Sequence, residues 1–156
     1  MKDNTIMIKI LFVCHGNICR SPMAEFVMKD MVKKAGRDGD IYVESAATSR
    51  EEIGNDIHYG TRAKLRECGI PFSRRAARQM TAHDYDDFDY IIAMDQYNLS
   101  NIKRIIGEDR KHKVYKLLDF TVRRGQDIAD PWYTGDFDTT YDDITEGCRG
   151  LLEKLT

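Results

Sequence analysis

The 156-residue sequence lacks both a long hydrophobic run and an excess of charge of one sign. No apolar stretch approaches the roughly 18 residues that a membrane-spanning helix needs, so we expect no membrane association. The 24 Lys and Arg residues nearly balance the 26 Asp and Glu residues, which gives a net charge of −2. A nucleic-acid-binding domain usually carries a basic excess, so we expect no nucleic-acid partner. The apolar run 6–13, broken by Lys9, is too short for a secretory signal.

Cysteine is scarce as well, with only Cys14, Cys19, Cys68 and Cys148. Four cysteines in a chain of this length are too few for a secreted domain that is stabilised by disulfides. The sequence has no C-x-x-C pair and its four histidines are scattered, so no structural zinc site is predicted. These observations favour free thiols in a reducing compartment, the cytoplasm, and leave open whether any thiol does chemistry.

Composition and patterning indicate one globular unit. Apolar residues make up 42% of the chain and charged residues 32%. Folding of a chain this long buries about 70% of its unfolded accessible area, enough for one core. No repeat, linker or low-complexity tract interrupts the sequence. We therefore expect residues 1–156 to form a single domain, and a monomer.

Hydrophobic periodicity predicts strands that alternate with helices. Strands are expected at 6–13, 41–46, 88–94 and 114–118, and helices at 22–35, 58–68 and 95–106, with a last helix along the apolar stripe 141–155. Ser21 is a good N-cap for the first helix. The alternation is typical of an α/β fold with a four-stranded parallel sheet, right-handed crossovers and helices on both faces. Such sheets bind ligands beyond the carboxyl ends of their strands, so the loop after the first strand is the first candidate site.

That loop places Cys14 and Arg20 six positions apart. The spacing alone is weak, since Cys68 and Arg74 share it in an unrelated context. The first pair, however, follows a buried strand and precedes a helix, whose N-terminus adds partial positive charge. Gly16 and its neighbour, an asparagine, tolerate unusual backbone angles, so consecutive loop amides can form an anion nest.

The side chains of the loop fit a phosphate beside a thiolate. Arg20 offers a planar fork for bidentate contact with phosphate oxygens. Ser21 can donate a hydrogen bond to a thiolate, cap the helix, or both. These features favour the thiolate form of Cys14, which is then placed for in-line attack on phosphorus. The residues expected to bind phosphate are His15, Gly16, Asn17, Ile18, Cys19 and Arg20.

The sequence resembles the low-molecular-weight protein tyrosine phosphatases over nearly its whole length. The motifs, in consistent order, are V-C-H-G-N-I-C-R-S-P-M-A-E at 13–25, S-A-A-T at 45–48, A-R-Q-M-T at 77–81, D-Y-I-I-A-M-D at 89–95 and D-P-W-Y at 130–133. The resemblance implies a flavodoxin-like four-stranded parallel sheet. It also implies hydrolysis of phosphotyrosine in proteins and of small aryl phosphates through a phosphocysteine on Cys14.

Cleavage of an aryl ester needs a proton for the leaving oxygen, and two aspartates are candidates. Asp130 precedes Pro131, which biases it toward an extended backbone, and two aromatic residues follow that can wall a cleft. The resemblance assigns the general acid to this D-P aspartate, and Asp127 is the alternative. We expect no metal and no cofactor, because Arg20 and the amides supply the positive charge.

Supporting roles follow from the resemblance. It implies that Asn17 and Ser45 hold the loop's shape, whereas Arg75 stands where the family often has a histidine. The family resemblance also supports a reversible disulfide between Cys19 and Cys14 that would protect the nucleophile from further oxidation.

Three further residues have structural interpretations. Cys148 lies on the apolar stripe of the last helix, and Cys68 lies at a helix end, so both are predicted to belong to the core. Asp95 is expected to cap the helix that follows it.

The substrate pocket is expected to be lined by Ile18, loop 49–57, Trp132 and Tyr133. Aromatic and apolar walls of this kind suit a flat phenyl ring. Glu51 and the glutamate after it stand where the family often has an aromatic residue, so an acidic rim that favours basic peptides is predicted.

Three alternatives remain at this point. Some relatives dephosphorylate phosphoarginine, but that branch typically has threonine at the position of Ile18. Arsenate reduction needs a relay of two further cysteines, for which Cys68 and Cys148 are poorly placed. A phosphocysteine carrier or anion-binding module would not need the acid that D-P-W-Y offers.

Overall fold

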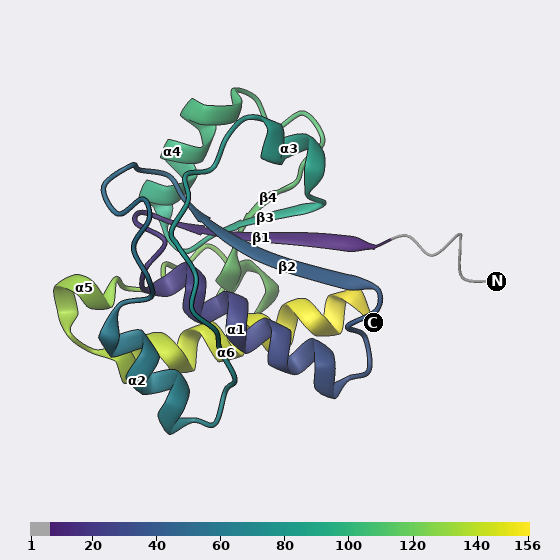
Figure 1. Cartoon of the computed structure of the whole chain (residues 1–156). Coiled ribbons are helices and arrows are strands. Elements are labelled where there is room, and N and C mark those ends of the chain that lie inside the picture. Colours follow the sequence, from purple (N-terminus) through teal and green to yellow (C-terminus); the bar gives the residue numbers. More distant parts are fainter. Residues whose placement is uncertain (1–6) are drawn as a thin grey trace.

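The computed structural model describes residues 7–156, in which strands and helices alternate as the hydrophobic pattern predicts (Figure 1). The expectations about residue 6 and the N-terminal segment before it lie outside this range. The strands are β1 (Ile8–Cys14), β2 (Ile41–Ala47), β3 (Tyr90–Ala93) and β4 (Val114–Lys116). The helices are α1 (Arg20–Lys34), α2 (Tyr59–Glu67), α3 (His83–Asp87), α4 (Gln96–Ile106), η1 (Leu117–Phe120, a 3-10 turn), α5 (Pro131–Thr134) and α6 (Phe137–Leu155).

The four strands form one parallel sheet in the order β2-β1-β3-β4, which confirms the predicted α/β fold and its flavodoxin-like arrangement. β1 pairs with both neighbours and is buried on both faces, which explains its nearly continuous apolar sequence. Its alternating residues enter two cores: Ile10 and Phe12 pack with α1 and α6, and Leu11 and Val13 pack on the side of α4. Figure 1 shows these helices on opposite faces of the sheet.

Helix α6 lies unusually close to the segment that follows β4. A Cβ atom at Gly150 would lie 2.0 Å from the carbonyl oxygen of Phe120, and one at Gly147 would lie 2.4 Å from Leu117 Cγ. Only glycine permits this approach. The contact fixes the path of the chain from the edge of the sheet toward α5.

The structure differs from the prediction in several local features. Helix α1 begins at Arg20 with Cys19 as N-cap, so the prediction of Ser21 as the cap was wrong, and Ser21 lies in the first turn instead. β3 and β4 are shorter than predicted. The one-turn elements η1 and α5 and the five-residue α3 were missed because such short helices have no periodicity to detect. Cys68, predicted in the core, is only half-buried, whereas Cys148 is fully buried as predicted.

Within residues 7–156, no helix is long and apolar enough to cross a membrane.

Candidate active site

The loop between β1 and α1 starts at the carboxyl end of the central strand, where Cys14 pairs with Ala47 of β2. Asn17 adopts a left-handed backbone conformation with φ of 59°. Gly16 has no left-handed φ, and it lies against the next loop: a Cβ there would be 3.1 Å from Glu52 Cγ. The loop therefore curls tightly against residues 49–57.

The peptide groups of this loop point in two directions. The carbonyl oxygens turn outward: His15 accepts from the Ser49 N–H at 3.1 Å and Ile18 from the His58 N–H at 2.9 Å. In contrast, no group in the described part of the chain accepts a hydrogen bond from the N–H of Gly16, Asn17, Ile18 or Cys19. Four consecutive amide donors at a helix N-terminus are thus available to an anion.

Cys14, the last residue of β1, is 3% exposed. Its Sγ atom is 3.1 Å from Ser21 Oγ and accepts the Ser21 N–H at 3.4 Å. Ser21 Oγ accepts a hydrogen bond from Asn17 Nδ2 at 2.8 Å, so its own proton can go to the Cys14 sulfur or to the Ala46 carbonyl oxygen, which is 3.4 Å away. Both contacts stabilise a thiolate.

Asn17 and Ser45 are connected as expected for residues that support the loop. The second hydrogen of Asn17 Nδ2 bonds Ser45 Oγ at 2.9 Å, and Ser45 donates to Glu25 Oε1 at 2.5 Å. Asn17 Oδ1 accepts the Arg78 N–H at 3.2 Å. Sequence reasoning missed Glu25 and Arg78, whose contacts become visible only when α1, β2 and the 77–81 segment are packed together.

Arg75 supports the same loop from outside. Its guanidinium donates to the carbonyl oxygen of Asn17 and, at 3.1 Å, to that of Asn55. The residue that departs from the family's histidine therefore still holds the nucleophile loop, and it also joins that loop to residues 49–57.

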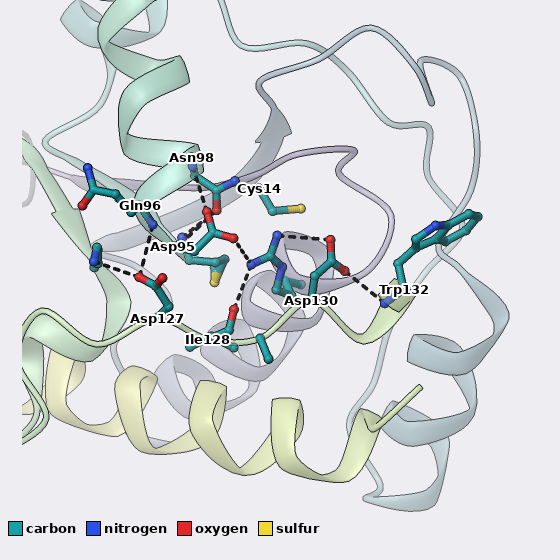
Figure 2. Close-up of polar contacts among 12 residues, drawn as sticks. Cys14, Asp95, Gln96, Asn98, Asp127, Ile128, Asp130 and Trp132 are labelled. Carbon is teal, nitrogen blue, oxygen red and sulfur yellow. Dashed lines mark hydrogen bonds and ion pairs between the residues drawn. The ribbon is translucent and has the colours of Figure 1, made fainter. Parts of the chain in front are cut away.

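Arg20 is 2% exposed and connects the loop to two distant segments. Nη1 donates to Asp95 Oδ2 at 2.7 Å and to the Ile128 carbonyl at 2.9 Å, and Nη2 donates to Asp130 Oδ2 at 3.3 Å (Figure 2). Burial lowers the pKa of Arg20, but the nearby Cys14, Asp130 and Asp95 outweigh it and raise the pKa above its usual value. Nε has no partner in the described structure, which leaves one buried guanidinium donor free for a ligand.

The two candidate acids have different surroundings. Asp130 caps α5, where its Oδ1 accepts the Trp132 N–H at 3.0 Å, and it lines the same pocket as Cys14. Asp127 is paired with Lys116 Nζ at 2.8 Å and accepts the Gln96 N–H at 3.2 Å (Figure 2). Asp127 does not line the pocket, so the geometry favours Asp130.

The pocket is formed by the loops after β1 and β2 and by the segment at α5. Its lining residues are Cys14, His15, Gly16, Ile18, Cys19, Glu51, Glu52, Asp130, Trp132 and Tyr133. The structure thus brings together the predicted pocket residues Ile18, Glu51, Trp132 and Tyr133. The sequence did not reveal that the His15 ring contacts the rim, with Nε2 3.1 Å from Glu51 Oε2.

Cys19 shares the pocket with Cys14 but differs in chemistry. Burial, followed by the nearby Cys14 and Asp130, raises the pKa of Cys19 to about 12. It therefore remains a protonated thiol at neutral pH. Both cysteines are free thiols in this structure.

No group of three or more His, Cys, Asp or Glu side chains able to hold a metal ion occurs among residues 7–156.

A thiol, a guanidinium and a carboxyl group around a loop of free amides define a class of enzymes that process phosphate esters with a cysteine nucleophile. The family model described as "Low molecular weight phosphotyrosine protein phosphatase" matches residues 9–156, so the chain belongs to this family. By class it is a protein-tyrosine-phosphatase, a hydrolase.

Individual relatives cover almost the whole chain. The low molecular weight protein-tyrosine-phosphatase YfkJ of Bacillus subtilis is 43% identical over 150 residues, 96% of each chain. PtpA of Staphylococcus aureus is 41% identical over 149 residues, 96% of this chain and 94% of the relative. The crystal structure of YfkJ matches with a TM-score of 0.93, covering 97% of this chain and 96% of that one at 42% identity. A Drosophila arginine phosphatase, DARP, matches with a TM-score of 0.84 and 32% identity, covering 96% and 98%.

Proposed function

We propose that the chain hydrolyses phosphotyrosine in proteins, and small aryl phosphates, through a phosphocysteine intermediate on Cys14. The observation that carries this proposal is the set of four free amides, with the free Nε–H of Arg20, around a buried sulfur. Such donors match the oxygens of a phosphate group and hold its phosphorus next to the nucleophile.

In the first step the Cys14 thiolate attacks phosphorus in line with the leaving phenol. The S–P bond forms while the P–O bond to the ring breaks, and Asp130 gives its proton to the departing oxygen. The loop amides and Arg20 stabilise the charge on the three non-bridging oxygens. The Trp132 N–H and Arg20 orient the Asp130 carboxyl group for this transfer.

In the second step a water molecule takes the place of the phenol. Asp130, now a carboxylate, removes a proton from the water as its oxygen attacks phosphorus. The S–P bond breaks, phosphate leaves, and the Cys14 thiolate is restored. Ser21 stabilises the thiolate as leaving group through its hydroxyl and its N–H.

The walls of the pocket favour an aromatic ester. Ile18, which is buried, lines the pocket together with Trp132 and Tyr133, which are 56% and 82% exposed. A phenyl ring fits between such walls, and Glu51 with its neighbour Glu52 gives the rim a negative charge. Because DARP is an arginine phosphatase of the same fold, phosphoarginine is the second candidate substrate.

The steady-state hydrolysis of a phosphotyrosine peptide and of a matched phosphoarginine peptide, with and without vanadate, tests both candidates. We expect a higher kcat/KM for phosphotyrosine and inhibition by vanadate, which occupies the phosphate position. Cys14→Ser should reduce turnover to background, while Cys68→Ser, a half-buried cysteine outside the pocket, serves as the matched control. Faster cleavage of phosphoarginine would overturn the substrate assignment, and an active Cys14→Ser protein would overturn the mechanism.

The proposal extends to the cellular location of the enzyme, its oligomeric state and the redox partner of Cys14. We propose a cytoplasmic location, because free thiols persist in a reducing compartment. We also propose that the enzyme acts as a monomer. The proposal also assigns Cys19 as the partner of Cys14 in a reversible disulfide, supported by their position in one pocket.

A further inference from the structure

His58 lies at the start of α2 and is attached to the nucleophile loop through its backbone. Its N–H donates to the Ile18 carbonyl at 2.9 Å. Thr61, in the first turn of α2, donates its hydroxyl to the carbonyl of Cys19 at 3.2 Å. The start of α2 is thus hydrogen-bonded to two consecutive residues of the loop, and its position is fixed relative to the nucleophile.

The ring of His58 contacts the segment that carries Asp130. It meets the Trp132 ring edge to face, with centroids 5.5 Å apart and planes at 74°, and it stacks on Phe137 at 5.6 Å. Edge-to-face pairs of this kind are favourable. In the described structure this is the one aromatic contact of Trp132. The ring contact therefore adds to the bonds from Arg20 to Ile128 and Asp130 that hold this segment, and it acts on the four-residue helix α5 itself.

The orientation of the His58 ring is itself fixed. Nδ1 accepts the Gly60 N–H at 3.0 Å, which caps α2 and leaves the proton of the neutral ring on Nε2. Gly60 carries no Cβ because the Phe137 ring occupies that space: a Cβ would lie 2.4 Å from Phe137 Cζ. Burial and then Arg62 lower the pKa of His58, against opposing effects of Glu52 and Asp130, which favours the neutral ring.

We propose that His58 is a positioning residue that orients Asp130 through Trp132, an inference that rests on the proposed role of Asp130 as general acid. The Trp132 N–H donates to Asp130 Oδ1 at 3.0 Å, while Arg20 holds Oδ2 (Figure 2). His58 contacts the ring of Trp132, and the donor to Asp130 is the backbone N–H of the same residue, so a shift of the Trp132 backbone displaces one of the two donors that orient the carboxyl group. Small displacements of a proton donor lower the rate of the step that needs it.

Two substitutions separate the ring of His58 from its cap. His58→Asn removes the ring but keeps a side-chain oxygen that can cap α2, so this variant should fold. His58→Phe keeps an aromatic ring against Trp132 but has no acceptor for the Gly60 N–H. Trp132 is the only tryptophan in the sequence, so the intrinsic emission of the protein reports directly on its surroundings.

The kinetic readout compares two esters by kcat/KM, which covers the steps up to departure of the phenol. Phenyl phosphate needs a proton on its leaving oxygen, whereas 2,4-dinitrophenyl phosphate, with a very acidic phenol, does not. For His58→Asn we expect a shifted emission of Trp132, a loss of about tenfold on phenyl phosphate and less than about twofold on the dinitrophenyl ester. His58→Phe should keep the emission and most of the activity on phenyl phosphate.

Asp130→Ala, measured in parallel, separates failure of this inference from failure of the mechanism. Suppose that Asp130→Ala loses activity mainly on phenyl phosphate, but His58→Asn slows both esters equally or slows neither. His58 then does not position the acid, and the mechanism stands. If Asp130→Ala slows both esters equally, Asp130 is not the general acid, and the proposed role of His58 is wrong as well. Unchanged Trp132 emission in His58→Asn would also overturn the proposed contact.

Discussion

Asp95 and Arg20 form an ion pair at 2.7 Å although 75 positions separate them in the sequence. The second oxygen of Asp95 accepts the Asn98 N–H at 2.8 Å, so one carboxylate both caps α4 and orients the guanidinium (Figure 2). The capping role was predicted, and the contact with Arg20 was not. The contact depends on the pairing of β1 with β3, because each residue follows the end of one of these strands.

Asp95→Asn should separate the two roles. Asparagine caps helices as well as aspartate does, so α4 should persist, but Arg20 loses a charged acceptor. We expect the free energy of unfolding to fall by about 2 kcal/mol and inhibition by phosphate to weaken about tenfold. Chemical denaturation and inhibition constants measure these effects. Asp127→Asn is the control, and equal weakening in both variants would contradict a specific role for Asp95.

Arg75→Ala should weaken the nucleophile loop. The substitution removes two hydrogen bonds, to the Asn17 and Asn55 carbonyl oxygens; Asn55 still accepts from the Ala77 N–H at 2.7 Å, whereas Asn17 loses its partner. We expect kcat/KM to fall about tenfold on esters of good and poor leaving groups alike, since the whole phosphate site loosens. Arg74→Ala, at the exposed neighbouring position, should change little. A fall in kcat/KM confined to esters with poor leaving groups would indicate instead that Arg75 acts on the general acid Asp130.

Cys19→Ser should make the enzyme more sensitive to peroxide. Oxidised Cys14 has a neighbouring thiol with which it can condense, and serine cannot form that disulfide. We expect wild-type activity to return after treatment with dithiothreitol and the variant to recover several-fold less. Because the pKa of Cys19 is raised to about 12, brief alkylation at pH 7 should label Cys14 first, as peptide mass spectrometry can determine. Equal recovery of both proteins would contradict the protective role.

Reversing the charge of the rim with Glu51→Lys and Glu52→Lys should change the preference of the enzyme among peptide substrates. The ratio of kcat/KM for a basic over an acidic phosphotyrosine peptide should fall about tenfold, and the change should shrink as salt screens the exposed charges. Turnover of a small aryl phosphate, which carries no peptide charges, is the internal control. Identical peptide ratios in the variant and the parent protein would exclude an electrostatic role for the rim.

Gly150→Ala should destabilise the fold although alanine favours helices. The added Cβ would meet the Phe120 carbonyl at 2.0 Å, so α6 or η1 must move. We expect a loss of about 2 kcal/mol in the free energy of unfolding, more than the roughly 1 kcal/mol that alanine gains in helix propensity. Gly39→Ala, with no atom within 4 Å of its Cβ, is the control and should change stability by less than about 0.5 kcal/mol.

The sequence was most informative where function is carried by consecutive residues. The positions of Cys14 and Arg20 relative to β1 and α1 follow from local patterns, and the sheet follows from alternating periodicity. Arg75, Glu25 and His58 could not be placed in the same way. Their partners lie in other elements, and no local spacing encodes which carbonyl or ring a side chain will reach after packing.

The three partners of Arg20 have a consequence for how activity arises during folding. Its contacts reach across 75, 108 and 110 positions of the chain, to Asp95, Ile128 and Asp130. Contacts of such long range form late in folding, because closing the intervening loops costs entropy first. After dilution from denaturant, enzymatic activity should therefore recover later than the helical circular dichroism signal. Recovery of activity then reports the formation of the last tertiary contacts.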